Sequence, residues 1–376
     1  AGWGGGAPAG AGRPPPPAWG PPAGGGAQAG PAVRAHADRI ADALGKRFGR
    51  VEELALALAG MGDVRALPAL RDLAKDGRLP SGRARARILG ALPVADMLPV
   101  VLPGLRQEPE RYHASVVSLE LLAAWGPAAA PAVPDVIRYL DSPYADDALR
   151  VLGRIGPAAA VAADRLAAYA TGRDPRARSH HPRRAAWAHW KVTGDPALAL
   201  DVCGAAVGSG TAGHGLPFLA DLGPAAAAHA DTVRGLMASS GAWTRVAAAY
   251  AYWRITGDPE PAVPVLLAEV DPHWTGQPAL PTPEAVRRLG GIGAPAAAAA
   301  PLLRRIHASA HRLGHPYDGV RILADEAYVR TLGEALARMG ADAGPGRGGT
   351  APEPVLPARR RLLAGWRGPR TAARPS

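Results

Sequence analysis

A glycine-marked break between two apolar segments recurs along this chain of 376 residues and limits the folds open to it. It is clearest between Val116 and Tyr169, where an apolar run, a Gly-Pro-Ala-Ala-Ala segment and a second apolar run return after 30 residues. The break glycines follow one another at intervals of 28–38 residues: Gly62, Gly90, Gly126, Gly156, Gly194, Gly223, Gly257 and Gly293. Periods of about 20–50 residues are typical of proteins built from stacked repeats. The sequence therefore predicts an array of repeated units rather than one large core.

Each break has the residues of a corner between two helices. Glycine accepts the left-handed backbone conformation that ends a helix, and proline has the φ angle of a helical first turn. The segments Thr193–Pro196 and Thr256–Pro259 both read Thr-Gly-Asp-Pro, which places an aspartate between the glycine and the proline. We expect the aspartate carboxylate to accept hydrogen bonds from free N–H groups at the start of the second helix.

The second helix of each predicted pair has one apolar face. In two of these helices apolar residues fall at positions i, i+3, i+4 and i+7: Val133, Val136, Ile137 and Leu140 in one, and Val263, Leu266, Leu267 and Val270 in the other. Such spacing puts the side chains on one side of a helix. Because a single pair cannot cover both of its apolar stripes, neighbouring pairs must stack. We therefore predict an all-α fold, an α-solenoid of about eight stacked helix pairs.

The two ends of the chain differ in composition from the array. Residues 1–33 are rich in Gly, Pro and Ala, and residues 341–376 are rich in Arg, Pro and Gly. Neither segment can bury enough apolar surface to offset the entropy of ordering it, so we expect disordered tails on either side of a solenoid at 34–340. Residues 1–33 lack the apolar run of a secretory signal, and no stretch is expected to match the roughly 20 apolar residues of a membrane span. With one cysteine in the chain, these expectations favour a cytoplasmic location and no membrane partner.

Two further segments bear on the organisation of the array. Gly208–Gly215 is rich in glycine but lacks the Lys-Ser/Thr ending of a phosphate-binding loop, so we expect a connector between helices. Asp318–Met339 has the length and pattern of one longer helix, and we expect this helix to close the stack.

The Gly-Pro-Ala and Gly-Asp-Pro corners resemble those of HEAT-like repeats, the units of many α-solenoids, and in particular the bacterial type related to bilin lyases. The resemblance covers about residues 50–310. It implies stacked helix pairs in a bacterial protein. HEAT-like proteins serve as adaptors, as enzyme subunits and in a few cases as enzymes, so the resemblance leaves the function open.

The positive charge of the chain is concentrated in two places. The net charge is +11, to which the loop 173–184 contributes +4 and residues 344–376 contribute +6, so the rest of the chain is nearly neutral. The loop is a candidate site for phosphates or an acidic partner through five arginines: Arg173, Arg176, Arg178, Arg183 and Arg184. The alternative is a solvated insertion loop without a ligand, and both interpretations remain open.

Residue patterns for metal binding or covalent catalysis are missing from the sequence. The chain has 11 histidines but no His-Glu dipeptide and no His-Glu-x-x-His motif, so we expect no metal and no cofactor. His307 continues the apolar pattern of Leu303 and Ile306, which predicts a packed histidine. Cys203 aligns with Leu266 of another repeat, which predicts a buried and unreactive thiol.

Aromatic residues recur at matching positions of the repeats. Aligning the two Thr-Gly-Asp-Pro corners places Trp190 on Trp253 and Trp187 on Tyr250. Shared packing positions produce such a recurrence, whereas an active site breaks the symmetry of the repeats. Together with the missing catalytic patterns, this predicts that the protein is not an enzyme.

The second helices also carry charged residues that we expect to point outward into a groove: Asp135, Arg138, Arg234, Glu269, Arg304 and Arg305. Their mixed signs favour a protein or peptide partner over a polyanion. The first hypothesis is therefore a non-enzymatic scaffold for protein–protein interaction. The second is a nucleic-acid-associated protein that uses the loop 173–184 and the basic C-terminal tail. The third is a subunit of an enzyme such as a lyase-like HEAT protein, for which the resemblance identifies no catalytic residue.

Overall fold

The computed structural model describes residues 31–46, 51–80, 86, 88–106, 112–177, 181–209, 212–276, 280–309, 313 and 319–341. Within these ranges the protein is all-helical and contains no strand, as the sequence predicts. The chain divides into two compact units, Ala1–Thr232 and Val233–Ser376. The two predicted tails lie outside the described residues, except for residues 31–33 and Ala341. The first helix begins at Pro31, slightly earlier than expected, because proline is well tolerated in the first turn of a helix.

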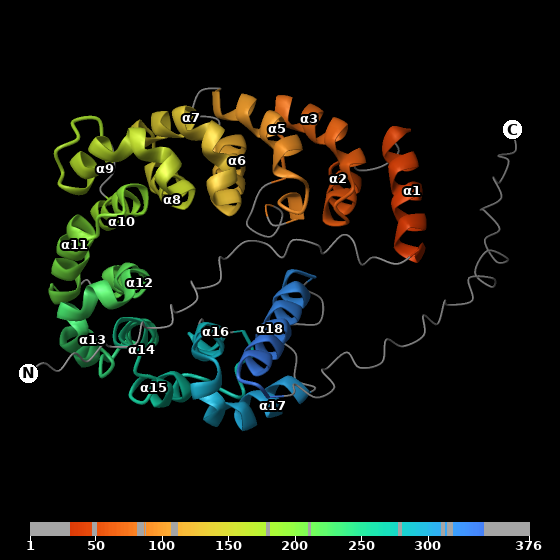
Figure 1. Ribbon diagram of the computed structural model, residues 1–376. Helices are drawn as coiled ribbons and strands as arrows, with labels where there is room; N and C mark the ends of the chain where they lie inside the picture. The colour runs from red at the N-terminus through yellow and green to blue at the C-terminus, as the bar shows by residue number, and fades with distance from the viewer. Residues whose placement is uncertain are drawn as a thin grey trace, which may run out of the picture. The chain divides into compact units, whose positions relative to one another are not determined.

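Unit 1 is a succession of short helices, most of which pack against the next one in the chain. Figure 1 shows α6, α8, α10 and α12 in one row of this unit and α7, α9 and α11 in another, and α6 contacts α8, α8 contacts α10, and α10 contacts α12. Its elements are α1 (Pro31–Gly45), α2 (Val51–Gly60), η1 (Val64–Ala66), α3 (Leu67–Lys75), α5 (Val94–Arg106), α6 (Tyr112–Trp125), η2 (Gly126–Ala132), α7 (Val133–Arg138), η3 (Tyr139–Asp141), α8 (Ala145–Ile155), η4 (Gly156–Ala162), α9 (Ala163–Ala170), α10 (Pro182–Thr193), α11 (Ala197–Gly208), α12 (Ala212–Leu222) and η5 (Gly223–His229), where η marks a 3-10 helix.

Unit 2 follows the same alternation with fewer helices. Its elements are most of α13 (Ala230–Leu236), α14 (Ala242–Thr256), α15 (Ala262–Ala268), α16 (Thr282–Ile292), η6 (Ala294–Ala299), α17 (Ala300–Ala308) and α18 (Gly319–Arg338). Helix α14 packs on α15 and α16, and both α16 and α17 pack on α18. The long helix predicted at 318–339 is confirmed by α18.

The two Thr-Gly-Asp-Pro corners form the same hydrogen bonds. In the first, Thr193 Oγ1 donates to the carbonyl oxygen of His189 at 2.8 Å, the Asp195 N–H donates to Thr193 Oγ1 at 3.1 Å, and the Ala197 N–H donates to Asp195 Oδ1 at 3.0 Å. The second repeats this set with distances of 2.9, 3.1 and 3.0 Å. Gly194 is left-handed, with a φ of 83°. The predicted role of the aspartate is confirmed at Asp195, because Ala197 is the first residue of α11, whereas Asp258 bonds Glu260 in the turn before α15. The predicted role of the glycine is confirmed at both corners, since Gly257 is also left-handed, with a φ of 77°.

The Gly-Pro-Ala corners are less abrupt than expected, because the chain continues through them as 3-10 helix. Gly126, Gly156 and Gly223 open η2, η4 and η5 with φ angles of 55°, 74° and 60°. Seven of the eight predicted corner glycines have a positive φ, and Gly90 is the exception. At Gly90 the prediction of a left-handed corner was therefore wrong.

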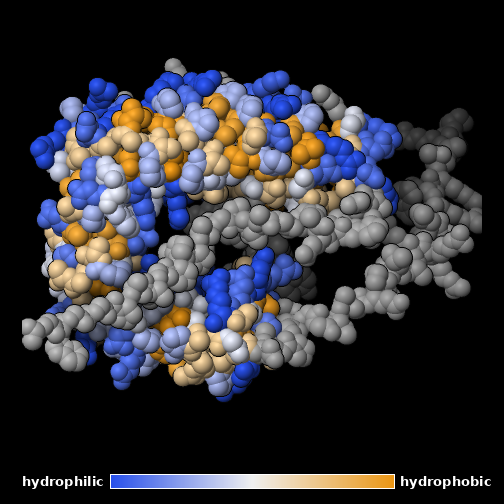
Figure 2. Space-filling view, viewed as in Figure 1, coloured by the Kyte–Doolittle hydropathy of each residue, from blue (hydrophilic) through white to orange (hydrophobic). Residues whose placement is uncertain are grey.

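The core is made by the predicted apolar stripes and by two tyrosines. Val133 is 3% exposed, and Val136 and Leu140 are fully buried. Tyr139 and Tyr169 are each 1% exposed, and Tyr139 Oη donates to the carbonyl oxygen of Leu105 at 3.1 Å. Burial of each large apolar side chain stabilises the fold by roughly 1.5–3 kcal/mol relative to its exposure. Figure 2 shows hydrophilic residues along the outer margin of unit 1 and hydrophobic residues between them.

One apolar run contradicts the expectation that nothing approaches the length of a membrane span. Val116–Asp141 has 26 residues and is long and apolar enough to cross a membrane, although 61% of its most apolar window is buried within the protein. Buried core helices pass the same test. The run is long because η2, α7 and η3 follow the end of α6 without a break in the helical structure.

Candidate functional site

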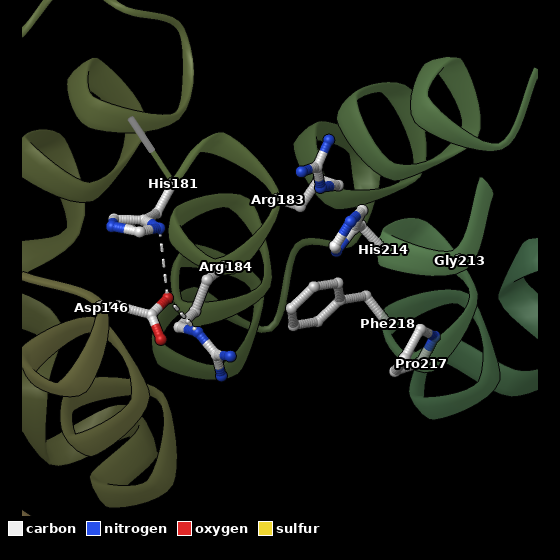
Figure 3. Close-up of a pocket in the computed structure, with 8 residues that line it drawn as sticks. All are labelled: Asp146, His181, Arg183, Arg184, Gly213, His214, Pro217 and Phe218. Atoms are coloured by element: carbon white, nitrogen blue, oxygen red, sulfur yellow. Dashed lines mark hydrogen bonds and ion pairs between the residues drawn. The ribbon is translucent and has the colours of Figure 1, made fainter. Parts of the chain in front are cut away.

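A cavity of about 320 Å³ lies in unit 1 where α8, α10 and α12 begin (Figure 3). Asp146 comes from the first turn of α8, and His181 directly precedes the first turn of α10, which contains Arg183 and Arg184. The remaining lining residues come from the first two turns of α12: Gly213, His214, Pro217 and Phe218. Three helix N-termini therefore meet at one cavity, and each contributes a positive end of its helix dipole.

An ion pair fixes one side of the cavity. Asp146 Oδ1 accepts a hydrogen bond from Arg184 Nε at 2.5 Å and lies 3.5 Å from His181 Nδ1. The Arg184 guanidinium also lies 5.6 Å from the centroid of the Phe218 ring. Asp146 thus neutralises Arg184, while Phe218 supplies an apolar surface beneath the guanidinium.

The other side of the cavity carries an uncompensated cation. Among the described residues, the half-buried Arg183 guanidinium has no carboxylate partner and no hydrogen bond. Figure 3 shows Arg183, His214 and Phe218 on the opposite side from Asp146. In the described part of the chain no side chain caps α10, and Pro182 has no N–H, so the N–H groups of Arg183 and Arg184 in the first turn are left without an acceptor within the helix. This arrangement favours an anion.

Packing behind the cavity holds the Phe218 wall in place. The Trp187 ring centroid is 6.2 Å from that of Phe218, and Trp187 is 7% exposed. Trp187 Nε1 donates to Asp221 Oδ2 at 2.7 Å, and Lys191 Nζ lies 2.9 Å from the same oxygen. A Cβ atom on Gly153 would lie 2.2 Å from Trp187 Cζ3, so the indole fills the space that a side chain there would take.

Of the aromatic residues predicted to share packing positions, Trp187 is buried. Its counterpart Tyr250 is half-buried, as are Trp190 and Trp253. Lys191 Nζ lies 3.8 Å from the centroid of the Trp190 ring, so this aromatic position carries a cation on its surface.

Cys203 and His307 are packed as the sequence predicts. Cys203 is fully buried, as is its counterpart Leu266, and Cys203 Sγ lies 3.9 Å from the carbonyl oxygen of Arg183. Burial raises the pKa of the Cys203 thiol to about 12, against a smaller lowering effect of the Arg183 charge. His307 is 6% exposed.

The arginines of the predicted loop 173–184 that the structure describes lie on two different elements. Arg183 and Arg184 belong to α10, while Arg173 and Arg176 are exposed on the turn that follows α9, and Arg178 lies outside the described residues. The Arg173 Nε donates to Thr171 Oγ1 at 3.1 Å. The prediction of a continuous loop was wrong because Pro182 starts a helix, and this helix directs its arginines toward α8 and α12.

A buried carboxylate holds the described part of this loop against α9. The Asp174 side chain is 5% exposed and accepts a hydrogen bond from Arg165 Nε at 3.0 Å and another from the Arg176 N–H at 2.9 Å. Arg165 also pairs with Asp141. Burial alone raises the pKa of Asp174, but the hydrogen bonds from Arg176 and Arg165 outweigh it, so the pKa lies below its usual 3.8.

Two of the six predicted groove residues do not point outward. The Asp135 carboxylate is 13% exposed and lies 3.2 Å from Arg106 Nε, and the Glu269 carboxylate is 13% exposed and lies 2.6 Å from Arg245 Nε. Helical periodicity identified these positions as polar, but it contains no information about a cation on another helix, which is α5 for Arg106 and α14 for Arg245. The other four are exposed: Arg138 in unit 1, and Arg234, Arg304 and Arg305 in unit 2.

Sequence reasoning missed Asp146, His214 and Phe218 as cavity residues. The segment 208–215 was expected to be a connector, but α12 begins at Ala212 and brings His214 to the cavity. Gly215 allows this start, since a Cβ there would lie 2.8 Å from the carbonyl oxygen of Cys203. No motif joins these residues in sequence, because only the packing of α8, α10 and α12 brings them together.

The cavity lining has no hydroxyl or thiol nucleophile. Over the described ranges of the chain, no group of three or more His, Cys, Asp or Glu side chains is placed to hold a metal ion. A scan against protein-family models finds no match to this chain, and a search of the curated proteins finds none either.

Proposed function

We propose that this protein is a HEAT-like α-solenoid of the cytoplasm and acts as a non-enzymatic scaffold for a protein partner. The partner contacts unit 1 at the cavity where α8, α10 and α12 begin. The observation that carries the proposal is the Arg183 guanidinium, which is half-buried in a cavity and has no counterion among the described residues. Because a half-buried charge without a partner has lost part of its hydration, its presence at a surface cavity favours an anionic group brought by a ligand.

The order of helix contacts in unit 1 supports the solenoid. Each of α6, α8 and α10 packs on the next member of its row, and the corners between the rows repeat their glycine conformation. Such neighbour-to-neighbour packing builds the extended surfaces that repeat proteins use to bind partners. A cavity lined by several successive repeats is a place where a scaffold of this kind recognises one partner.

The cavity supports binding rather than catalysis. Asp146 is the one carboxylate among its lining residues, and it already accepts a hydrogen bond from Arg184 and lies beside His181. A nucleophile with a positioned base would be needed for covalent catalysis, and the lining offers no such nucleophile.

The test is affinity capture from bacterial lysate with the full chain and two charge-reversal variants. Arg183→Glu removes the free cation of the cavity, whereas Arg173→Glu makes the same charge change at an exposed site on the turn after α9. The proposal expects a defined set of proteins that the natural chain and Arg173→Glu retain and Arg183→Glu loses, at about 150 mM salt. Equal retention by all three proteins would refute it, provided that circular dichroism shows each to be folded.

The nucleic-acid hypothesis is tested in the same experiment. It rests on the net charge of +11 and on the exposed Arg173 and Arg176. Under this hypothesis nuclease treatment abolishes retention, and both variants bind less nucleic acid in proportion to their charge. Retention that survives nuclease and depends on Arg183 alone favours the protein scaffold.

A further inference from the structure

We infer that the cavity at the start of α8, α10 and α12 binds one carboxylate group of the protein partner, presented beside an apolar side chain. This inference rests on the proposed function and names the chemistry that the partner brings. The ligand is a segment with an aspartate, a glutamate or a chain-terminal carboxylate next to an apolar residue.

The charges of the cavity fit a single negative charge. Asp146 neutralises Arg184, to which it is joined at 2.5 Å, so Arg183 is left as the one arginine of the cavity lining without a partner among the described residues. The N–H groups at the start of α10 that have no acceptor within the helix add a partial positive charge. A carboxylate matches this balance, whereas the dianion of a phosphate monoester leaves one negative charge unmatched.

The geometry of the donors also fits a carboxylate. A guanidinium offers parallel N–H groups that match the two oxygens of a carboxylate, and such bidentate pairs are stronger than neutral hydrogen bonds. The cavity volume of about 320 Å³ is at the small end of ligand sites, which span about 300–1,000 Å³. This volume is sufficient for one or two side chains.

The apolar wall specifies what accompanies the carboxylate. Pro217 and Phe218 line the cavity on the same side as Arg183 in Figure 3. Phe218 is held from behind by Trp187, which is itself anchored by its hydrogen bond to Asp221. A flat or branched apolar group therefore finds a fixed surface within reach of the free guanidinium.

Three small probes test this inference on the full chain by ligand-observed NMR. The first is 3-phenylpropionate, which joins a carboxylate to an apolar ring. The second is 3-phenylpropionamide, which has the same shape without the charge, and the third is phenyl phosphate. The expected result is that the carboxylate binds at least tenfold more tightly than the amide, since a hydrogen bond to a charged group contributes about that factor. Phenyl phosphate is expected to bind more weakly than the carboxylate.

Matched variants locate the binding in the cavity. Arg183→Gln and Phe218→Ala are each expected to weaken the carboxylate probe about tenfold, and Arg173→Gln to leave it unchanged. Equal binding of acid and amide to the natural chain would overturn the inference even if Arg183→Gln fails to fold. Tighter binding of phenyl phosphate, or of a single-stranded oligonucleotide whose binding requires Arg183, would also overturn it.

The two proposals fail in distinguishable ways. If the probes bind as expected but no captured protein depends on Arg183, the carboxylate site is supported and the scaffold proposal is refuted. If the capture of a protein depends on Arg183 but the acid and amide probes bind equally, the scaffold proposal is supported and the carboxylate inference is refuted.

Discussion

Gly126 lies against the main-chain carbonyl oxygen of Arg154, which a Cβ atom on Gly126 would approach to 3.2 Å. The same relationship recurs between Gly156 and Lys191, at 3.6 Å, and in unit 2 between Gly293 and Arg338, at 3.3 Å. Each carbonyl belongs to the last turn of a helix in the following repeat. The corner glycine thus has two roles, because its positive φ turns the chain and its missing side chain lets the next helix approach.

Replacement of Gly126 by alanine is expected to destabilise the protein by about 1–3 kcal/mol, through strain at a φ of 55° and crowding against the Arg154 carbonyl oxygen. Gly194→Ala is the matched control, because Gly194 has a φ of 83° but open space around its Cβ position. The free energy of unfolding of both variants is measured in urea. The loss at Gly194 reports the backbone strain alone, and the additional loss at Gly126 reports the contact with the Arg154 carbonyl oxygen. A cost at Gly126 no larger than that at Gly194 would show that the contact is unimportant.

Gly153→Ala tests the packing of α8 on α10. The new methyl group would lie 2.2 Å from Trp187 Cζ3, so the indole must move, and we expect a loss of about 1–3 kcal/mol. Trp187→Phe makes room at this position and is expected to reduce the cost of Gly153→Ala in the double variant. Additive effects of the two substitutions in urea unfolding would contradict this contact.

Asp174→Asn is expected to destabilise the protein by about 2 kcal/mol at pH 7, since it removes a charged acceptor for Arg165 and the Arg176 N–H. The pKa of Asp174 is lowered in the folded protein from 3.8. Its stabilising effect is therefore fully present above the unfolded value and disappears as the pH falls through the lower folded value. The difference between the natural chain and the variant should accordingly shrink below about pH 4 in thermal unfolding scans. A difference that stays constant down to pH 2 would contradict the assignment.

The Cys203 thiol is expected to resist alkylation in the folded protein. With its pKa raised to about 12, almost no thiolate is present at pH 8, and the side chain is fully buried. Mass spectrometry after iodoacetamide treatment should find the native chain unmodified and the urea-unfolded chain fully modified. Since burial raises this pKa, the contribution of Cys203 to stability is complete below the unfolded pKa, near 8.5, and declines as the pH rises toward 12. Rapid alkylation of the native chain at pH 8 would contradict a buried Cys203 thiol with a raised pKa.

The sequence predicts the local structure well because the helix corners and the apolar helix faces depend on residues that are close together in the chain. The Thr-Gly-Asp-Pro hydrogen bonds join residues no more than four positions apart, so their chemistry is visible in the sequence. The burial of Val136 and Leu140 follows from helical spacing alone. Gly90 shows the limit of this reasoning, because a glycine in the right place does not have to adopt a positive φ.

The candidate site was only partly predictable. Arg183 and Arg184 stood out by charge, but their assignment to a loop hid the fact that a helix directs them toward Asp146 and Phe218. These residues belong to three helices, and the register between successive helices decides which side chains meet. That register depends on packing details such as the contact of Trp187 with Gly153. The spacing of the repeats in the sequence does not predict such contacts.

The Thr193 and Thr256 corners have a consequence for how the chain acquires its structure. The turn in each corner is stabilised by hydrogen bonds between residues that are close in sequence, and none of these bonds involves another repeat. Contacts of such short range form early in folding, because little loop entropy opposes them. These corners can therefore form before the helices that they join have packed on neighbouring helices. A corner that is already formed fixes the direction of the second helix and so reduces the number of incorrect packing arrangements.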